Sequence, residues 1–130
     1  MRQSREHGLT RARLRRIWRT MAIYKIFRGP EWDAFAAAGH SLGAPIDLRD
    51  GYVHLSTATQ VEETAARHFA GEDGLMLLAV DETRLVPELR WEPSRGGALF
   101  PHLYRELRGE DILWSAPLPL EGERHRFPPL

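Results

Sequence analysis

The stretch DGYVHLSTATQVEETAARHF, residues 50–69, decides the fold of this 130-residue chain. It begins with the turn signal Asp50-Gly51, and the next residues, YVHLS over 52–56, alternate between polar and apolar side chains. Because successive side chains of a strand point to opposite faces, Val53 and Leu55 are predicted to face the core. The pattern therefore predicts a short, half-buried strand.

A helix is predicted directly after this strand. Thr57, with Gln60 three residues later, has the pattern of a capping box, in which side chains bind the free backbone N–H groups of the first turn. Apolar residues then repeat every four positions, which predicts a helix with one buried face: Val61, Ala65 and Phe69. The helix is predicted to end at Gly71, since glycine commonly ends helices. Its N-terminus would offer free N–H groups and the positive end of the helix dipole, which suit a phosphate.

Three hydrogen-bonding side chains, Tyr52, His54 and Ser56, share the other face of the predicted strand. Beside an anion site, His54 could act as a proton donor, a proton acceptor or a phosphate contact. Thr57, at the start of the helix, would adjoin the same ligand. The alternative interpretation is a half-buried histidine that hydrogen-bonds a neighbour and has no chemical function.

The rest of the chain predicts more strands and one more helix. Gly29-Pro30 is expected to begin a helix that ends at Gly39, and residues 40–50 are expected to form a polar loop. LMLLAV over 75–80 predicts a central strand buried on both faces. Short strands are expected at 23–27, 89–91 and 112–114, with a loop or short strand at 100–104. Two strand–helix units followed by short strands predict a single α+β domain with one mixed sheet.

Composition excludes several classes of function. The chain has no cysteine, so it has no disulfide scaffold, thiolate metal site or cysteine nucleophile. No apolar run approaches the roughly 20 residues of a spanning helix, so no membrane partner is expected. For a chain without cysteine, a reducing cytoplasm is the default location. Metal-ligand spacings such as HExxH are absent from the sequence, and no metal cofactor is expected.

The formal net charge of zero hides an uneven distribution. Residues 1–20 contain seven arginines and a single acid, Glu6. Such a segment could be a transit peptide or a nucleic-acid-binding arm, so nucleic acid is not excluded as a partner. The alternative is a disordered or frayed leader that precedes the native start at Met21. We expect one domain over 21–120 and a tail over 121–130.

A second group of aromatic and cationic residues surrounds the turn Gly96-Gly97. Such side chains around a tight turn are typical of a pocket that stacks a planar ring with a charged attachment. The alternative is a hairpin core whose polar residues are merely exposed. The members of this group are Arg90, Trp91, Arg95, Phe100, His102 and Tyr104.

Lys25 occupies an unusual position for an amine. On the predicted strand 23–27 it shares a face with two apolar residues, so it either extends along an edge strand to water or faces a cleft. Together with His54 and His102, it could supply the base, the acid and the charge stabilisation for metal-free phosphodiester transfer.

The segments IYKIF, DGYVHLSTATQVEETAARHF, LLAVD, LRWEPSRGGALFPHLY and ILW follow one another in this order between Met21 and about Leu120. In this they resemble the small bacterial family catalogued as domain of unknown function 952. The resemblance implies a fold similar to the ADP-ribosyltransferases: a mixed split β-sheet with two main helices and a cleft that holds NAD in active relatives. Within that superfamily, VHLST and the LLAVD strand resemble the RNA 2′-phosphotransferases, which use NAD to remove a 2′-phosphate.

The resemblance implies a site for NAD or a related nucleotide, and possible transfer of ADP-ribosyl or phosphate groups. His54 and Ser56 match the HLS of those enzymes beside the bound nucleotide. Tyr24 and Lys25 fall where they have Tyr-His at the nicotinamide side, so Lys25 replaces a histidine. The other residues expected to line or close the cleft are Tyr52, Thr57, Trp91, His102 and Tyr104. The alternative is a non-catalytic module that binds a small molecule or a protein.

Overall fold

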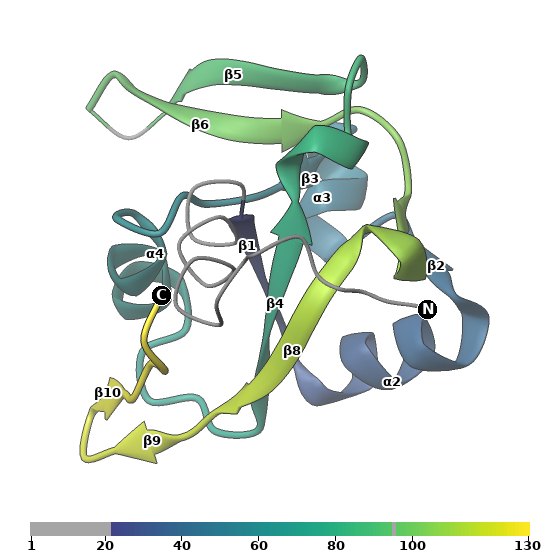
Figure 1. The fold of residues 1–130 in the computed structure, drawn as a ribbon. Helices are drawn as coiled ribbons and strands as arrows, with labels where there is room; N and C mark the ends of the chain where they lie inside the picture. Colours follow the sequence, from purple (N-terminus) through teal and green to yellow (C-terminus); the bar gives the residue numbers. More distant parts are fainter. Residues whose placement is uncertain (1–21, 95) are drawn as a thin grey trace, which may run out of the picture.

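A computed structural model describes residues 22–94 and 96–130 of the chain. The predictions for residues 1–20 and for Arg95 fall outside the described residues. The part of the chain that the structure describes folds as one small α+β domain, as predicted (Figure 1). Its strands form two three-stranded sheets and two short ribbons. Two of its three α-helices lie beside the first sheet, and the third lies next to the second sheet.

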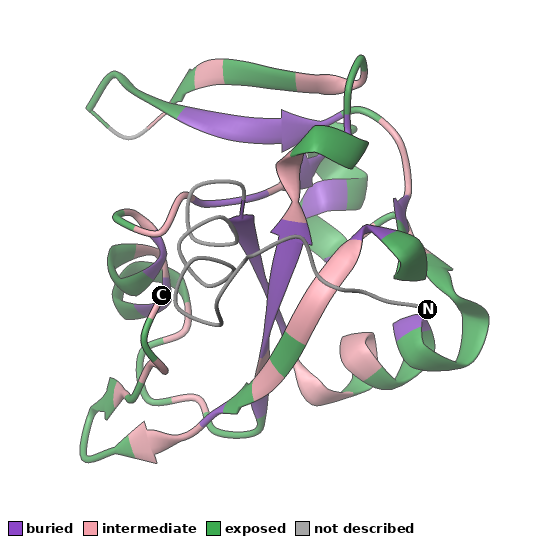
Figure 2. Ribbon diagram, in the orientation of Figure 1, coloured by how far each residue is buried: buried purple, intermediate pink, exposed green. Residues whose placement is uncertain are grey.

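The first sheet is the centre of the domain. Its order is β1-β4-β8, and its strands are β1 (Ala22–Phe27), β4 (Leu75–Asp81) and β8 (Ile112–Leu118). The middle strand β4 is buried along almost its whole length, which confirms the prediction for LMLLAV (Figure 2). The predicted strands at 23–27 and 112–114 are likewise confirmed as β1 and the start of β8.

The second sheet carries the polar residues of interest and has the order β3-β6-β5. Its strands are β3 (Val53–His54), β5 (Leu89–Ser94) and β6 (Ala98–Leu103), so FPHLY lies mainly in a strand. Tyr24 of β1 and Ser56 exchange two backbone hydrogen bonds, of 2.7 and 2.9 Å, which join the two sheets. The sheet is thus divided as expected, but every strand pair among the described residues runs antiparallel rather than as a mixture.

Short elements connect these sheets. One ribbon pairs β2 (His40–Ser41) with β7 (Leu107–Arg108), and the other pairs β9 (Leu120–Glu121) with β10 (Arg124–His125). Helix α2 (Gly29–Ala38) begins at the predicted Gly-Pro and ends before Gly39, which adopts φ 82°. Two 3-10 turns, η1 (Glu82–Arg84) and η2 (Gly109–Asp111), precede strands β5 and β8.

The prediction of a polar loop over residues 40–50 was wrong. The segment contains β2 and a six-residue helix, α3 (Pro45–Asp50). Pro45 stands at the first helical position, where its fixed φ favours the helix, and Gly51 ends it in the left-handed conformation at φ 88°. A helix of six residues is too short to show an amphipathic repeat, so periodicity could not reveal it.

The helix predicted from Thr57 begins later and is shorter. Helix α4 spans Val61–His68, and residues 58–60 form a turn before it. Half of the predicted capping box is present, because the Gln60 side chain accepts a hydrogen bond from the Thr57 backbone N–H at 3.0 Å. The Thr57 hydroxyl contacts Thr59 instead of the helix backbone.

The central sheet separates two hydrophobic cores. Because side chains alternate along β1, Ile23 and Phe27 enter the core beneath α2 and the second sheet, whereas Tyr24 and Ile26 enter the core beneath α4. The C-terminal segment, expected to be a tail, contains β10 and packs Phe127 against the α4 core. Among the described residues, no helix is long and apolar enough to cross a membrane.

Candidate functional site

The register of the second sheet gathers five polar and aromatic side chains on one face. His54 of β3 pairs with His102 of β6, and His102 pairs in turn with Arg90 of β5. Residues paired across antiparallel strands lie on the same face, so these three side chains form a row. Tyr52 and Tyr104 lie two residues from His54 and His102, and strand alternation places them on that face too.

The aromatic rings of this row are in contact with one another. The Tyr52 ring stacks on His102 with centroids 4.1 Å apart, and it lies 4.6 Å from His54 and 5.1 Å from Tyr104. The guanidinium of Arg90 lies 4.7 Å from the centre of the Tyr104 ring. The rings therefore form one continuous cluster, called here the ring cluster: Tyr52, His54, His102 and Tyr104.

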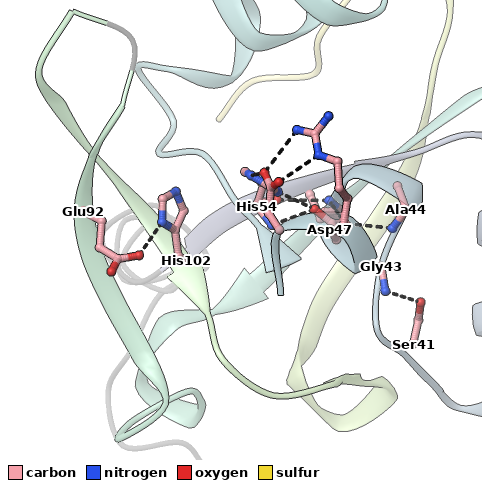
Figure 3. A network of polar contacts seen from close by, with 10 residues as sticks. Ser41, Gly43, Ala44, Asp47, His54, Glu92 and His102 are labelled. Atoms are coloured by element: carbon pink, nitrogen blue, oxygen red, sulfur yellow. Dashed lines mark hydrogen bonds and ion pairs between the residues drawn. The ribbon is translucent and has the colours of Figure 1, made fainter. Parts of the chain in front are cut away.

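A buried carboxylate, Asp47 of α3, holds the imidazole of His54 (Figure 3). His54 Nδ1 lies 2.6 Å from one carboxylate oxygen, and the backbone N–H of His54 donates to the same oxygen at 3.0 Å. The other oxygen accepts hydrogen bonds from Lys25 Nζ at 2.6 Å and from the Ala44 backbone N–H at 2.7 Å. Asp47 thus accepts from four donors, which requires an ionised carboxylate.

The surroundings of Asp47 favour its charged form. Burial alone would raise the pKa of this carboxyl, since the Asp47 side chain has no exposed surface. The hydrogen bond with His54 and the positive charge of Lys25 outweigh burial and lower the pKa of Asp47 to about 2. Lys25, which is 5% exposed, also donates to the His54 carbonyl oxygen at 3.1 Å. Lys25 and Asp47 thus each hydrogen-bond the backbone of β3 at His54.

The second nitrogen of His54 faces another carboxylate. Nε2 lies 3.0 Å from Asp50, the last residue of α3, and Asp50 is also held by the Arg49 guanidinium at 2.9 Å. Both nitrogens of the ring therefore stand within hydrogen-bond distance of carboxylate oxygens. Only a ring that carries a proton on each nitrogen can donate to both carboxylates at once.

His102 has a carboxylate partner of its own on the neighbouring strand (Figure 3). Its Nδ1 lies 2.6 Å from Glu92, which also accepts a hydrogen bond from the Tyr104 hydroxyl at 2.8 Å. The hydrogen bond from His102, and then that from Tyr104, lowers the pKa of Glu92, and the same Glu92 contact raises the pKa of Tyr104. The site thus contains two histidine–carboxylate pairs whose ring centroids are 5.4 Å apart.

Comparison with known proteins places the chain among proteins without an assigned function. The family model described as "Protein of unknown function (DUF952)" matches residues 26–115. The chain belongs to the DUF952 family. A search of curated proteins found no match to this chain.

Solved structures of another protein resemble this DUF952 domain. The crystal structure of protein CC0527 from Caulobacter crescentus has a TM-score of 0.78 and 46% identity, over 81% of this chain and 93% of that chain. The crystal structure of a double mutant of CC0527 gives a TM-score of 0.78 at 45% identity, over 81% and 93% of the two chains. The solution NMR structure of CC0527 has a TM-score of 0.72 and 47% identity, over 80% of this chain and 90% of that chain.

Five of the nine residues singled out by the sequence come together in the DUF952 domain. Lys25, His54 and Asp47 form the buried part of the site, and the ring cluster adds Tyr52, His102 and Tyr104. Lys25 lies on an edge strand, but it is buried in an ion pair rather than extended to water. Arg90 joins them above Tyr104, as the aromatic–cationic group suggested.

The other four lie elsewhere. Tyr24 is 2% exposed and packs in the α4 core with its ring 6.1 Å from Trp114, because alternation turns it away from Lys25. Ser56 is buried, and its hydroxyl is 2.8 Å from that of Thr64 in α4. Trp91 points to the face of β5 opposite Arg90.

The start of α4 is also unlike the predicted phosphate site. Thr57 lies four residues before the helix, and its hydroxyl contacts Thr59. The first turn of the helix carries Glu62 and Glu63, whose charges already complement the helix dipole and repel an anion. These features make the start of α4 less favourable to an anion than the sequence pattern indicated, and the phosphate site there stays a prediction.

Sequence reasoning missed the three carboxylates that hold the histidines: Asp47, Asp50 and Glu92. Asp47 and Asp50 lie in the segment predicted to be a loop, although their spacing of three places them on one side of a short helix. Glu92 lies two residues after Arg90 in β5, so strand alternation places both on one face, and this was the signal that the sequence offered for Glu92. Among the described residues, no group of three or more potential ligands could hold a metal ion.

Proposed function

We propose that this DUF952 domain binds NAD or a related nucleotide on the face of the β3-β6-β5 sheet and that His54 is the acid–base group of the site. The observation that carries the proposal is the buried Asp47 carboxylate, which holds Nδ1 of His54 at 2.6 Å. A buried carboxylate that fixes one imidazole nitrogen is the arrangement of many histidine acid–base sites. The other nitrogen, Nε2, contacts the exposed Asp50, and a ligand that displaces Asp50 could exchange a proton there.

Structural stability alone does not explain this arrangement. Removing the charges of Lys25 and Asp47 from water costs several kcal/mol per ion, and hydrophobic residues of similar volume are often as stabilising as such a buried pair. The four hydrogen bonds to Asp47 fix the position of this carboxylate and, through it, the orientation of the His54 imidazole. Precise orientation of a side chain is a requirement of a binding or catalytic site.

The ring cluster supports a ligand that contains planar rings. Tyr104 and Trp91 are each exposed and Tyr52 is half-buried, but only the two tyrosines lie on the face of His54. Their rings can stack with a base or a nicotinamide, and the exposed Arg90 can pair with a phosphate. The carboxylate of Glu92 can accept a hydrogen bond from a ribose hydroxyl. The residues present thus fit the rings, a phosphate and a ribose, with the phosphate at Arg90 rather than at α4.

The chemistry that NAD supplies when bound is an activated bond between ribose and nicotinamide. The protein's part is to orient the ligand and to hold or give a proton at His54 Nε2. The resemblance of VHLST to the NAD-dependent RNA 2′-phosphotransferases supports the same ligand, although Lys25 stands where they have a histidine.

The test is calorimetric titration of the protein with NAD, ADP-ribose and AMP, with chromatographic detection of released nicotinamide. We expect binding of NAD, and a loss of about tenfold or more in affinity or nicotinamide release in His54→Ala. His40→Ala is the matched control, because His40 is an exposed histidine of β2 that pairs with Glu106. Binding without release would identify a non-catalytic module. A folded protein that binds none of these ligands would overturn the proposal.

A second candidate function follows from the pairing of His102 with Glu92. Two histidines with ring centroids 5.4 Å apart, each next to a carboxylate, suit metal-free cleavage of a phosphodiester. One imidazole would take the proton of the attacking hydroxyl, and the imidazolium of the other would give a proton to the leaving oxygen. The assay is hydrolysis of cyclic nucleotides and short RNA in the presence of a chelator. Activity must disappear in both His54→Ala and His102→Ala for this candidate to stand.

A further inference from the structure

His54 is held differently at its two nitrogens. At Nδ1, Asp47 is completely buried and accepts three further hydrogen bonds, so its position is fixed by the fold. At Nε2, Asp50 is an exposed residue whose other partner, Arg49, is exposed as well. The inner carboxylate is therefore a permanent part of the site, whereas the outer one can leave without disturbing the core.

The outer carboxylate is surrounded by three donor nitrogens. One Asp50 oxygen lies 2.9 Å from Arg49 Nε. The other lies 3.0 Å from His54 Nε2 and 3.5 Å from Arg49 Nη2. A guanidinium and an imidazole nitrogen that converge on one carboxylate form the kind of set that binds phosphate and carboxylate groups of ligands.

The position of Asp50 in its helix does not explain this contact. Asp50 is the last residue of α3. The backbone carbonyl groups at that end of a helix carry partial negative charge, so a negative side chain is not favoured there. The Arg49 guanidinium, 2.9 Å away, and the contact with His54 Nε2 at 3.0 Å hold it there instead. An incoming oxyanion would meet the same two partners.

We propose that Arg49 and His54 Nε2 form an oxyanion-binding site and that the Asp50 carboxylate competes with the oxyanion of the ligand for it. The proposal rests on the proposed function in one respect, namely that His54 faces the ligand. It adds the chemical group that His54 recognises, which is an oxyanion rather than a hydroxyl or a ring. It also assigns Asp50 as an internal competitor that weakens this recognition.

A phosphate fits the donor set better than a carboxylate does. The three donors of Arg49 and His54 share two oxygens in the contact with Asp50. A phosphate has three acceptor oxygens and more negative charge, so each donor can have an oxygen to itself. We therefore expect a phosphate to displace Asp50 more readily than acetate does at the same ionic strength.

The experiment compares the affinity for inorganic phosphate of the wild-type protein, Asp50→Asn and Asp33→Asn by NMR titration at near-neutral pH and constant ionic strength. Asp33 is an exposed acid of α2, so its substitution removes the same charge far along the chain from the site. We expect Asp50→Asn to bind phosphate about fivefold or more tightly than Asp33→Asn, because the donors lose their internal partner. Acetate, titrated in the same way, should bind more weakly than phosphate.

A second variant keeps the test decisive if Asp50→Asn does not fold. Arg49→Gln changes an exposed side chain only and should weaken phosphate binding about threefold or more. Equal affinities of Asp50→Asn and Asp33→Asn, or an unchanged affinity of Arg49→Gln, would overturn the inference. If NAD and ADP-ribose do not bind but phosphate binding follows the expected order, the proposed function fails and the oxyanion site stands.

Discussion

At the scale of single residues, Asp47 decides what His54 can do. Its pKa is lowered from 3.8 to about 2, so Asp47 stabilises the folded state at a pH above about 4. This contribution, about 2 kcal/mol, is lost as the pH falls from about 4 towards 2, because the unfolded chain takes up a proton at this carboxyl in that range whereas the folded protein still holds it ionised.

We therefore expect Asp47→Asn to unfold more easily than the wild type at neutral pH but to lose less stability on acidification. The neutral-pH cost is about 3 kcal/mol or more, since Lys25 is left as a buried charge without its counter-ion. The measurement is urea unfolding at several pH values between about 3 and 7, with Asp33→Asn as the control. Parallel pH dependences of wild type and Asp47→Asn would contradict this account.

At the scale of elements, α3 is seated by a close approach between its first turn and the preceding glycine. A Cβ atom at Gly43 would stand 2.2 Å from the Asp47 carboxylate, and Gly43 adopts φ 103°, where side chains are strained. Gly39 has a similar φ of 82°, but no atom lies within 4 Å of the place its Cβ would take. A substitution at Gly39 thus introduces backbone strain alone, whereas one at Gly43 introduces strain and a steric clash with Asp47.

Gly43→Ala is expected to lower the free energy of unfolding more than Gly39→Ala does. Gly39→Ala costs the left-handed strain, about 1–2 kcal/mol, and Gly43→Ala adds the displacement of Asp47 from its four donors. Chemical denaturation of both variants gives the difference, and NMR signals of the His54 ring report the displacement directly. Equal losses in the two variants would show that Asp47 tolerates the added methyl group.

At the scale of the whole molecule, the C-terminal segment closes the core that lies on the other side of the central sheet from the site. Phe127 and Leu130 pack against the α4 core, and His125 contacts the Glu72 carbonyl oxygen at 2.6 Å. The segment therefore contributes to stability, whereas the ring cluster lies on the other sheet, β3-β6-β5.

Phe127→Ala is expected to destabilise the fold by about 2 kcal/mol, because the ring is half-buried against apolar side chains. Ligand binding at His54 should not change. Thermal unfolding and the phosphate titration measure the two effects, and Leu99→Ala, at a side chain 53% exposed, is the control that should change neither. A loss of phosphate binding in Phe127→Ala would mean that the two sides of the sheet are coupled.

The sequence by itself determined the parts of this protein that depend on local pattern. The continuous apolar run LMLLAV identified the buried strand β4, and the alternation in YVHLS placed Tyr52 and His54 on one face. Gly-Pro and Gly39 marked the ends of α2. These features follow from side-chain periodicity and backbone preferences, which neighbouring residues alone decide.

Only the tertiary structure decided which distant residues meet. Asp47 comes from a segment that reads as a loop, yet it holds Lys25 and His54, which are 22 and 7 residues away along the chain. Ser56 shares the alternation of His54, but its bridge to Tyr24 directs its hydroxyl to α4 instead. Hydrogen-bond partners depend on how sheets and short helices pack in three dimensions, and local periodicity carries no information about that packing.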